Sequence, residues 1–251
     1  MDKNTIHTIN ALNREFYQTF SDSFSSTRYQ VQPGVSRILK TLPSKSAILD
    51  LGCGNGNILK ELVKTRFSGT YYGVDFSENL IQKSRQMYRG LETPAQFEAD
   101  FSVFDLLQSN WDAFPVSDEW EIILAFAVLH HIPGNEMRKN LFQNVHAILK
   151  PAGRFIFSVW QPQNSRRLVK RFQSWEQVGL KESDVEEGDV LMDWKAGESQ
   201  SNKAGYRYVH IYSNEELEKL AAETGFSIDD SFYSDGKEGN IGLYQVWQKS
   251  G

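Results

Sequence analysis

The stretch Ile48-Leu49-Asp50-Leu51-Gly52-Cys53-Gly54-Asn55-Gly56 reads as a short buried strand that ends in a glycine-rich turn, before a helix beginning near Asn57. Glycine suits such a turn because residues with a Cβ avoid its backbone angles, and because a ligand can then approach the backbone closely. The free N–H groups at the start of the helix attract a carboxylate or a phosphate. The stretch therefore predicts a ligand site, although an ordinary connection without a ligand has the same outline.

A second acidic residue follows the next apolar strand. This strand, 70–75, ends in Asp75, whose carboxylate can bind the ribose hydroxyls of a nucleoside lying across the strand ends. Asp50, which precedes the glycine turn, would repel a pyrophosphate but attract an ammonium group. The predicted ligand therefore carries a positive charge at one end and a ribose at the other.

The order of the remaining elements predicts an α/β fold. Strands at 46–51, 70–75, 96–99, 121–126 and 154–160 alternate with helices at 56–66, 77–88 and 135–149. This rhythm is typical of a doubly wound parallel sheet. After a helix at 214–224, which Ser213 and Glu216 begin as a capping box, strands 226–233 and 241–248 form a terminal antiparallel hairpin. With the last strand inserted beside the fifth, we expect a seven-stranded sheet.

Bulk properties limit the classes of protein that the chain can be. Its 251 residues, with 40% hydrophobic residues, are expected to form a single domain over 1–251, with a helical cover at 1–45 and an insertion at 161–212. The net charge of −5 argues against a globally cationic nucleic-acid binder but allows a local positive surface. A single cysteine, a polar start and the absence of a long apolar run favour a cytoplasmic protein without a membrane span.

The glycine turn resembles motif I of class I S-adenosylmethionine (SAM) methyltransferases. The resemblance implies the Rossmann-like sheet of those enzymes and SAM as cofactor, with the turn at the methionine moiety, Asp75 at the ribose and Asp100 at the adenine amino group. Cys53 is expected to fill space rather than to act as a nucleophile. The expected cofactor-binding residues are Asp50, Gly52, Cys53, Gly54, Asp75, Phe76, Asp100, Phe101 and Ala127.

Two features mark the expected substrate side. His130 and His131 follow the apolar strand 121–126, at the edge where α/β sheets bind ligands. They are candidate substrate contacts, with a turn cap and a solvent-exposed ring as the alternative, and they lack a third ligand at the spacing of a metal site. Within the insertion, a basic helix is expected with Arg166, Arg167, Lys170 and Arg171, which is either an RNA-phosphate contact or a solvated face.

Several segments together resemble the eukaryotic tRNA wobble-uridine carboxyl methyltransferases, which convert 5-carboxymethyluridine to its methyl ester. The segments are 25–29, 127–131, 165–167, 189–195 and 207–212, with Trp160. The most specific is Arg-Tyr-x-His-x-Tyr-x-x-x-Glu-Leu at 207–217. The resemblance implies a tRNA anticodon loop as the substrate and a small zinc-containing activator protein as a partner. Departures at Gln32 and Asp193, where the family has tryptophan and proline, leave the fold unaffected but concern the substrate.

The chemistry of a carboxylate acceptor agrees with the lack of an obvious acid–base pair. A carboxylate is already ionised at neutral pH, so it needs orientation by cations or donors rather than a general base. The candidates are Arg28, Tyr29, His130, Arg207 and His210. The alternatives are a small-molecule O- or N-methyltransferase, which the net negative charge favours, and a SAM-binding accessory subunit.

Overall fold

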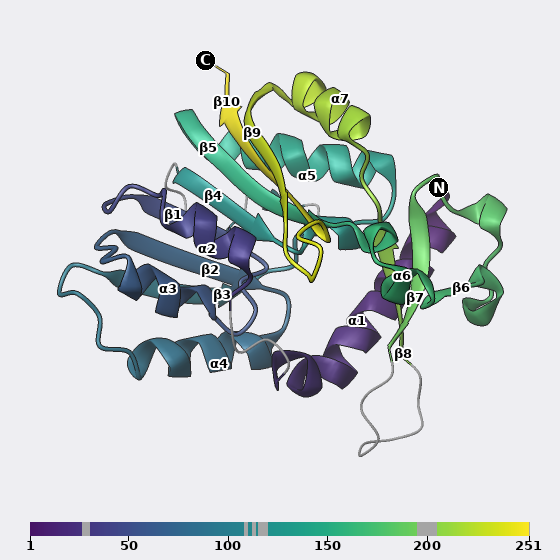
Figure 1. The fold of residues 1–251 in the computed structure, drawn as a ribbon, viewed down its shortest axis with the longest axis horizontal. Helices are drawn as coiled ribbons and strands as arrows, with labels where there is room; N and C mark the ends of the chain where they lie inside the picture. The colour runs from purple at the N-terminus through teal and green to yellow at the C-terminus, as the bar shows by residue number, and fades with distance from the viewer. Residues whose placement is uncertain (27–30, 108–109, 112–113, 115–119, 195–204, 251) are drawn as a thin grey trace.

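The computed structural model describes residues 1–26, 31–107, 110–111, 114, 120–194 and 205–250, and the side chains of these residues except 20–26. Within these residues the core is a seven-stranded sheet of order β3-β2-β1-β4-β5-β10-β9 (Figure 1). Its strands are β1 (Ala47–Leu51), β2 (Thr70–Asp75), β3 (Glu98–Val103), β4 (Trp120–Phe126), β5 (Leu149–Trp160), β9 (Phe226–Ser234) and β10 (Gly242–Lys249). The first five are parallel, and β10 is antiparallel between β5 and β9. The predicted sheet and terminal hairpin are confirmed.

Helices cover both faces of this sheet (Figure 1). One face packs on α2 (Pro33–Leu39), α3 (Ile58–Lys64) and α4 (Glu78–Arg89), and the other on α5 (Asn135–Ile148) and α7 (Asn214–Thr224). Adjacent residues of a strand point to opposite faces of the sheet. Ile48 therefore packs in the hydrophobic cluster under α2, α3 and α4, and Leu49 packs in the cluster under α5 and α7. The sheet is therefore doubly wound, as predicted.

The third strand is displaced from its predicted position. It was expected at 96–99, but β3 begins at Glu98 and continues to Val103, which pairs with Asp75 of β2. The polar residues Asp100 and Ser102 interrupt the apolar pattern that would indicate a strand, because β3 lies at the edge of the sheet. The helix after the glycine turn is also shorter than predicted, because α3 begins at Ile58.

The insertion folds differently from its prediction. Among the described residues it contains an antiparallel sheet of order β6-β7-β8, made by β6 (Phe172–Gln173), β7 (Asp189–Trp194) and β8 (Gly205–His210). The expected basic helix is only the single turn α6 (Arg166–Val169), so Lys170 and Arg171 lie beyond its end. Residues 195–204 of the insertion fall outside the described residues.

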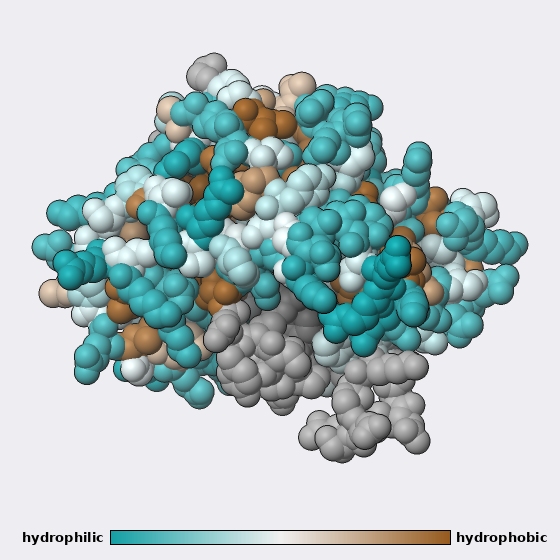
Figure 2. Space-filling model, in the orientation of Figure 1, coloured by the Kyte–Doolittle hydropathy of each residue, from teal (hydrophilic) through white to brown (hydrophobic). Residues whose placement is uncertain are grey.

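The long helix α1 (Lys3–Ser26) crosses below the carboxyl ends of the central strands and lies against β8 (Figure 1). It connects the large sheet with the small one. On the face seen in Figure 2 hydrophilic residues predominate, including those over α6. No helix in the described part of the chain combines the length and apolarity that a membrane span needs.

Candidate active site

A cavity of about 590 Å³ lies at the carboxyl ends of the parallel strands, beside α1. The ends of β1 and β2, the loop after β4 and the end of β5 all contribute to its wall. The cavity brings together eight of the residues predicted from the sequence: Asp50, Gly52, Cys53, Gly54, Asp75, Phe76, Ala127 and Arg207. This is the edge at which open α/β sheets bind their ligands.

The glycine turn has the backbone that its sequence requires. Gly52, Gly54 and Gly56 have φ angles of 70°, 58° and 76°, which glycine adopts without the strain of a Cβ. A Cβ on Gly52 would collide with Val128, whereas one on Gly54 would meet no atom within 4 Å. The Gly54 N–H donates to Asp75 Oδ2 over 3.0 Å, which fixes the turn to the end of β2.

Two buried carboxylates make one end of the cavity negative. Asp50 is 3% exposed and accepts a hydrogen bond of 2.6 Å from the Tyr71 hydroxyl. Burial raises the pKa of the Asp50 carboxyl to about 7, against the effect of the Tyr71 bond. Burial also raises the pKa of Asp75, although the backbone N–H groups of Ser77 and Gly54 oppose it. A ligand that brings a positive charge to this end would stabilise both ionised groups.

Cys53 lies beneath the same turn and fills space, as predicted. Its side chain is 8% exposed, and burial raises the pKa of its thiol well above the ordinary value. The thiol therefore stays protonated and is a poor nucleophile at neutral pH.

The structure does not bring Asp100 and Phe101 to the cavity. Asp100 lies within β3 opposite Tyr72 and is exposed, and Phe101 is buried in the hydrophobic core. Because β3 continues to Val103, the cavity wall is made instead by the residues that follow it, Phe104 and Asp105. Sequence reasoning missed both, although the apolar pair before Asp105 is a signal of a strand end.

Helix α1 contributes side chains to the wall of the cavity. Arg14 forms an ion pair with Asp105, and its guanidinium lies 5.7 Å from the centre of the Phe76 ring. One turn later, the Tyr17 ring packs edge-on against Phe76 at 6.3 Å. These contacts close the side of the cavity that faces away from the sheet.

Ala127 marks the boundary between the two ends of the cavity. Its φ of 57° is unusual for a residue with a Cβ. Its N–H donates to the Ser158 carbonyl and hydroxyl oxygens, at 3.1 and 3.0 Å, which holds this conformation. Such strain is found most often at ligand sites.

The two histidines have different roles. His131 lines the cavity, and His130 is 3% exposed with Nδ1 accepting the Trp160 N–H at 3.2 Å. His131 Nδ1 lies 2.9 Å from the Tyr208 carbonyl, which can only accept, so this nitrogen carries hydrogen. Its Nε2 lies 2.5 Å from the Tyr17 hydroxyl. His131 rather than His130 is therefore placed to meet a substrate.

Arg207 forms the positive wall of the opposite end. It is 3% exposed, and its guanidinium lies 4.5 Å from the Trp160 ring centre, with Phe16 at 5.3 Å and Trp194 at 5.6 Å. Such stacking holds the planar cation in one orientation. Arg167 and Arg171 of the insertion line the same region.

His210, another predicted acceptor contact, does not line the cavity. His210 is buried between Asp189 and Glu216, away from the residues that line the cavity. Ser213 caps α7 as predicted, because its hydroxyl oxygen accepts the Glu216 N–H at 3.0 Å, whereas the Glu216 carboxylate contacts His210 and Arg138. Arg28 and Tyr29 lie outside the described residues. No group of three or more metal-ligating side chains is found in the described part of the chain.

Comparison with known proteins agrees with this geometry. A family described as "Methyltransferase domain" matches residues 24–231. The chain belongs to this family. The fold of the methyltransferase is shared with a SAM-dependent methyltransferase from Clostridium acetobutylicum, at a TM-score of 0.65 and 17% identity over 94% of this chain and 99% of that one.

Relatives of known activity are also similar. The methyltransferase is 34% identical over 150 residues to tRNA (carboxymethyluridine(34)-5-O)-methyltransferase ALKBH8 of Macaca fascicularis, which covers 58% of this chain but 19% of the ALKBH8 chain. It is 26% identical to the Schizosaccharomyces pombe tRNA (carboxymethyluridine(34)-5-O)-methyltransferase over 87% of this chain and 90% of that one. The chain therefore spans about a fifth of the macaque relative and most of the yeast one.

The chain belongs to the methyltransferase-domain family, and the residues of the cavity fit SAM as the cofactor. The acidic end offers Asp50 to a cation, and the open space beside Gly54 admits a ligand against the backbone. SAM carries both an ammonium and a sulfonium, which suits buried carboxylates that are otherwise costly to ionise.

Proposed function

We propose that this methyltransferase transfers a methyl group to a carboxylate on a modified wobble uridine of tRNA. The observation that carries the proposal is the division of charge in one cavity. Asp50 and Asp75 line the cavity beside the glycine turn, and Arg207, Arg167 and Arg171 line it from the insertion. The other charged lining residues have partners in the fold: Arg14 pairs with Asp105, and Asp235 accepts from Gly34 and Tyr244. The activity in the names of the relatives from macaque and fission yeast supports the same substrate class.

The end of the cavity beside the glycine turn would bind SAM and orient its methyl group. Asp50 and the glycine turn would hold the methionine moiety, Asp75 the ribose, and Phe104 with Asp105 the adenine. When bound, SAM supplies a methyl group made electrophilic by the positively charged sulfur. The task of the protein is then to hold the acceptor in line with that group, which supplies most of the rate of such a transfer.

The residues at the other end of the cavity would orient the acceptor carboxylate. A guanidinium binds a carboxylate through two parallel hydrogen bonds, and the aromatic rings around Arg207 hold it ready for this contact. His131 and Tyr17 add polar groups on the facing wall. No general base is needed because the carboxylate is already ionised. The aromatic rings exclude water, which strengthens the ion pair.

The rim supports contact with RNA. Arg166, Arg167 and Lys170 are exposed, and their neighbours Leu168 and Arg171, like Arg167 itself, line the cavity. Cations in this place can bind the phosphates of an anticodon loop. A small zinc-containing activator protein and a cytoplasmic location stay predictions.

The test uses two forms of one tRNA, with 5-carboxymethyluridine or unmodified uridine at the wobble position. With labelled SAM, we expect the methyl ester only on the carboxymethylated form, measured by mass spectrometry of nucleosides. Both reactions are run with and without the zinc-containing activator protein of the host. Absence of product in all four reactions, with SAM bound normally, would refute the proposed substrate.

A small-molecule O- or N-methyltransferase is the second candidate. The net charge of −5 and Gln32, which lines the cavity where the family has tryptophan, favour it. A tRNA gel shift separates the two, because RNA binding weakens steeply with salt and a small-molecule enzyme shows no shift. A SAM-binding accessory subunit would bind SAM but methylate neither class of acceptor.

A further inference from the structure

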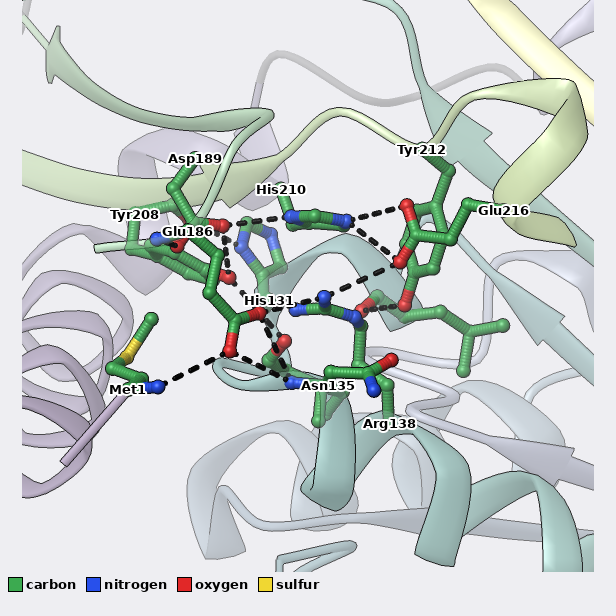
Figure 3. A network of polar contacts seen from close by, with 12 residues as sticks. Met1, His131, Asn135, Arg138, Glu186, Asp189, Tyr208, His210, Tyr212 and Glu216 are labelled. Carbon is green, nitrogen blue, oxygen red and sulfur yellow. Dashed lines mark hydrogen bonds and ion pairs between the residues drawn. The ribbon is translucent and has the colours of Figure 1, made fainter. Parts of the chain in front are cut away.

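A buried polar cluster joins the insertion to the large sheet's helices (Figure 3). Its members come from α5, the segment before β7, β7 itself, β8 and α7. They are Arg138, Glu186, Asp189, Tyr208, His210 and Glu216. Among the described residues that line the cavity, none belongs to this cluster. The mechanism above leaves these charges without a role.

His210 is the centre of the cluster. Its ring is 1% exposed, with Nδ1 at 2.7 Å from Asp189 Oδ1 and Nε2 at 2.8 Å from Glu216 Oε2 (Figure 3). An ionised carboxylate only accepts hydrogen bonds, so each ring nitrogen must donate. A neutral histidine has hydrogen on one nitrogen alone. The geometry therefore requires the imidazolium form.

The surrounding groups balance this charge. Arg138 Nη2 lies 2.8 Å from Glu186 Oε2 and 3.2 Å from Glu216 Oε1. Glu186 also accepts the Asn135 N–H at the start of α5 and lies 3.4 Å from the Met1 amino group. On the remaining sides, the Tyr208 hydroxyl donates to Asp189 and the Tyr212 ring packs edge-on against His210 at 4.7 Å. Loss of the His210 proton would leave this buried set with an excess of negative charge.

Strand β8 connects the cluster with the cavity. Tyr208 and His210 lie on the face of the strand that contacts Asp189, and Arg207 lies on the other face, which lines the cavity. The Tyr208 carbonyl accepts from His131 Nδ1, so the same strand fixes a second cavity residue. A shift of β8 would therefore move both acceptor-side groups together.

We propose, resting on the proposed function, that His210 is a positioning residue, a buried imidazolium between Asp189 and Glu216 that holds β8 so that Arg207 and His131 face the acceptor. The acceptor end is then sensitive to alkaline pH through a group that touches neither ligand. Burial of the ring lowers the pKa of His210, but the carboxylates of Asp189 and Glu216 outweigh it and raise the pKa above its ordinary value.

The sign of the pH effect follows from this direction. The folded protein holds the proton more tightly than the unfolded chain, so the stabilisation is complete below the unfolded pKa of about 6.5. It is lost as the pH rises through the folded pKa of His210. We therefore expect β8 to be held less firmly at pH values above the folded pKa of His210.

The experiment follows the histidine ring nitrogens by 15N NMR between pH 6 and 10. Signals are assigned by comparison with the H210Q and H131Q variants. We expect both nitrogens of His210 to carry hydrogen at pH 7.5. When His210 loses its proton, we expect the His131 Nδ1 signal to change at the same pH. Titration of His210 near its ordinary pKa, or independent behaviour of His131, would overturn the proposal.

A matched pair of variants on α7 separates positioning from general damage to the helix. Glu216→Gln removes the half-buried charge that contacts His210, and Glu223→Gln removes an exposed charge that pairs with Lys139 of α5 at 2.9 Å. We expect E216Q to lower the His210 pKa and to speed exchange of the His131 Nδ1 proton by about tenfold, with no change in E223Q. Equal effects in both variants would contradict a positioning role. If E216Q does not fold, the titration of His210 and His131 in the wild-type protein still tests the proposal.

Ligand binding completes the test. We expect E216Q to raise KM for the carboxylate acceptor by about tenfold, while the Kd of SAM stays within about twofold. An equal loss of SAM affinity would overturn the assignment to the acceptor end. The NMR readout uses no acceptor, so absence of methyl transfer in all four tRNA reactions would refute the proposed function and leave the role of His210 to be decided separately.

Discussion

At the scale of single residues, the environment of Asp50 decides how the cofactor end works. The carboxyl is buried beside Asp75 and is costly to ionise, so in the apo protein its pKa is about 7, and a bound cation would favour the ionised form. The sequence shows the acidic residue before the glycine turn. It does not show the Tyr71 hydroxyl, which reaches Asp50 from the neighbouring strand.

We expect SAM to bind more weakly as the pH falls through about 7, the pKa that burial gives Asp50. Protonation removes the attraction for the cation, so Kd should rise by up to about tenfold per pH unit below that value. Isothermal titration between pH 5.5 and 8.5 measures this. In D50N the affinity should be low at every pH, and a pH dependence that survives in D50N would contradict the assignment.

The same raised pKa has the opposite effect on the apo protein. An acid whose folded pKa exceeds its unfolded value destabilises the folded state at high pH, so the apo protein should gain stability as the pH falls from about 7 to 4. D50N should therefore raise the free energy of unfolding at pH 8, by up to about 4 kcal/mol. Urea unfolding at pH 8 and 5 tests this, and a destabilised D50N would refute it.

Asp105 and Asp100 form a matched pair for the adenine assignment. Asp105 lines the cavity and Asp100 is exposed within β3. We expect D105A to weaken SAM binding by about tenfold, or about 1.4 kcal/mol, and D100A to leave it unchanged. Isothermal titration of both variants decides, and D75A, with at least the same loss, serves as the positive control. A loss in D100A alone would restore the assignment made from sequence.

At the scale of elements, α2 is fixed to the terminal hairpin by one carboxylate. Asp235 accepts from the Gly34 N–H at 2.9 Å and from the Tyr244 hydroxyl at 2.6 Å. Gly34 packs so closely on the Tyr244 ring that a Cβ there would collide with it. This contact joins a helix near the start of the chain to the last two strands.

We expect G34A to destabilise the protein by about 1–3 kcal/mol, because the added methyl forces the Tyr244 ring or α2 to move. The control is G90A at the end of α4, where a Cβ would meet only ordinary contacts at 3.6 Å. Urea unfolding of both variants gives the comparison. If G34A were as stable as G90A, the close packing of α2 on the hairpin would be disproved.

Most of the large sheet could be predicted from the sequence, because its central strands are apolar runs that end at glycine, proline or acidic residues. β3 was misplaced because Asp100 and Ser102 interrupt the apolar pattern at the sheet edge. The small sheet could not be predicted, because Phe172 pairs with Met192 across a polar segment. The role of His210 likewise depends on its register with Asp189, which no local pattern reveals.

At the scale of the whole molecule, the net charge of −5 conceals a separation of charges. Asp50 and Asp75 line the cavity beside the glycine turn, and Arg167 and Arg171 line it from the insertion, next to the exposed cations Arg166 and Lys170. An acidic protein can therefore still present a local positive surface to an RNA. Composition alone could not separate these two regions, because residues distant in sequence form each of them.

We expect the double variant R166A/K170A to weaken tRNA binding and to reduce the slope of log affinity against log salt by about 2, one for each lost phosphate contact. Both side chains are exposed, and SAM affinity should not change. K219A, which removes an exposed cation from α7, is the control. An unchanged salt slope in R166A/K170A would exclude this rim from the RNA interface.

The single cysteine of the chain, buried beneath the glycine turn, has a practical consequence. A maleimide dye reacts with exposed thiolates, so it should pass over Cys53 and label a cysteine introduced on the surface. Fluorophores can thus be attached at chosen points of the wild-type background. Slow modification of Cys53 itself would then report how often the glycine turn opens. Protection of Cys53 from modification would measure the fraction of molecules with the methyl donor bound.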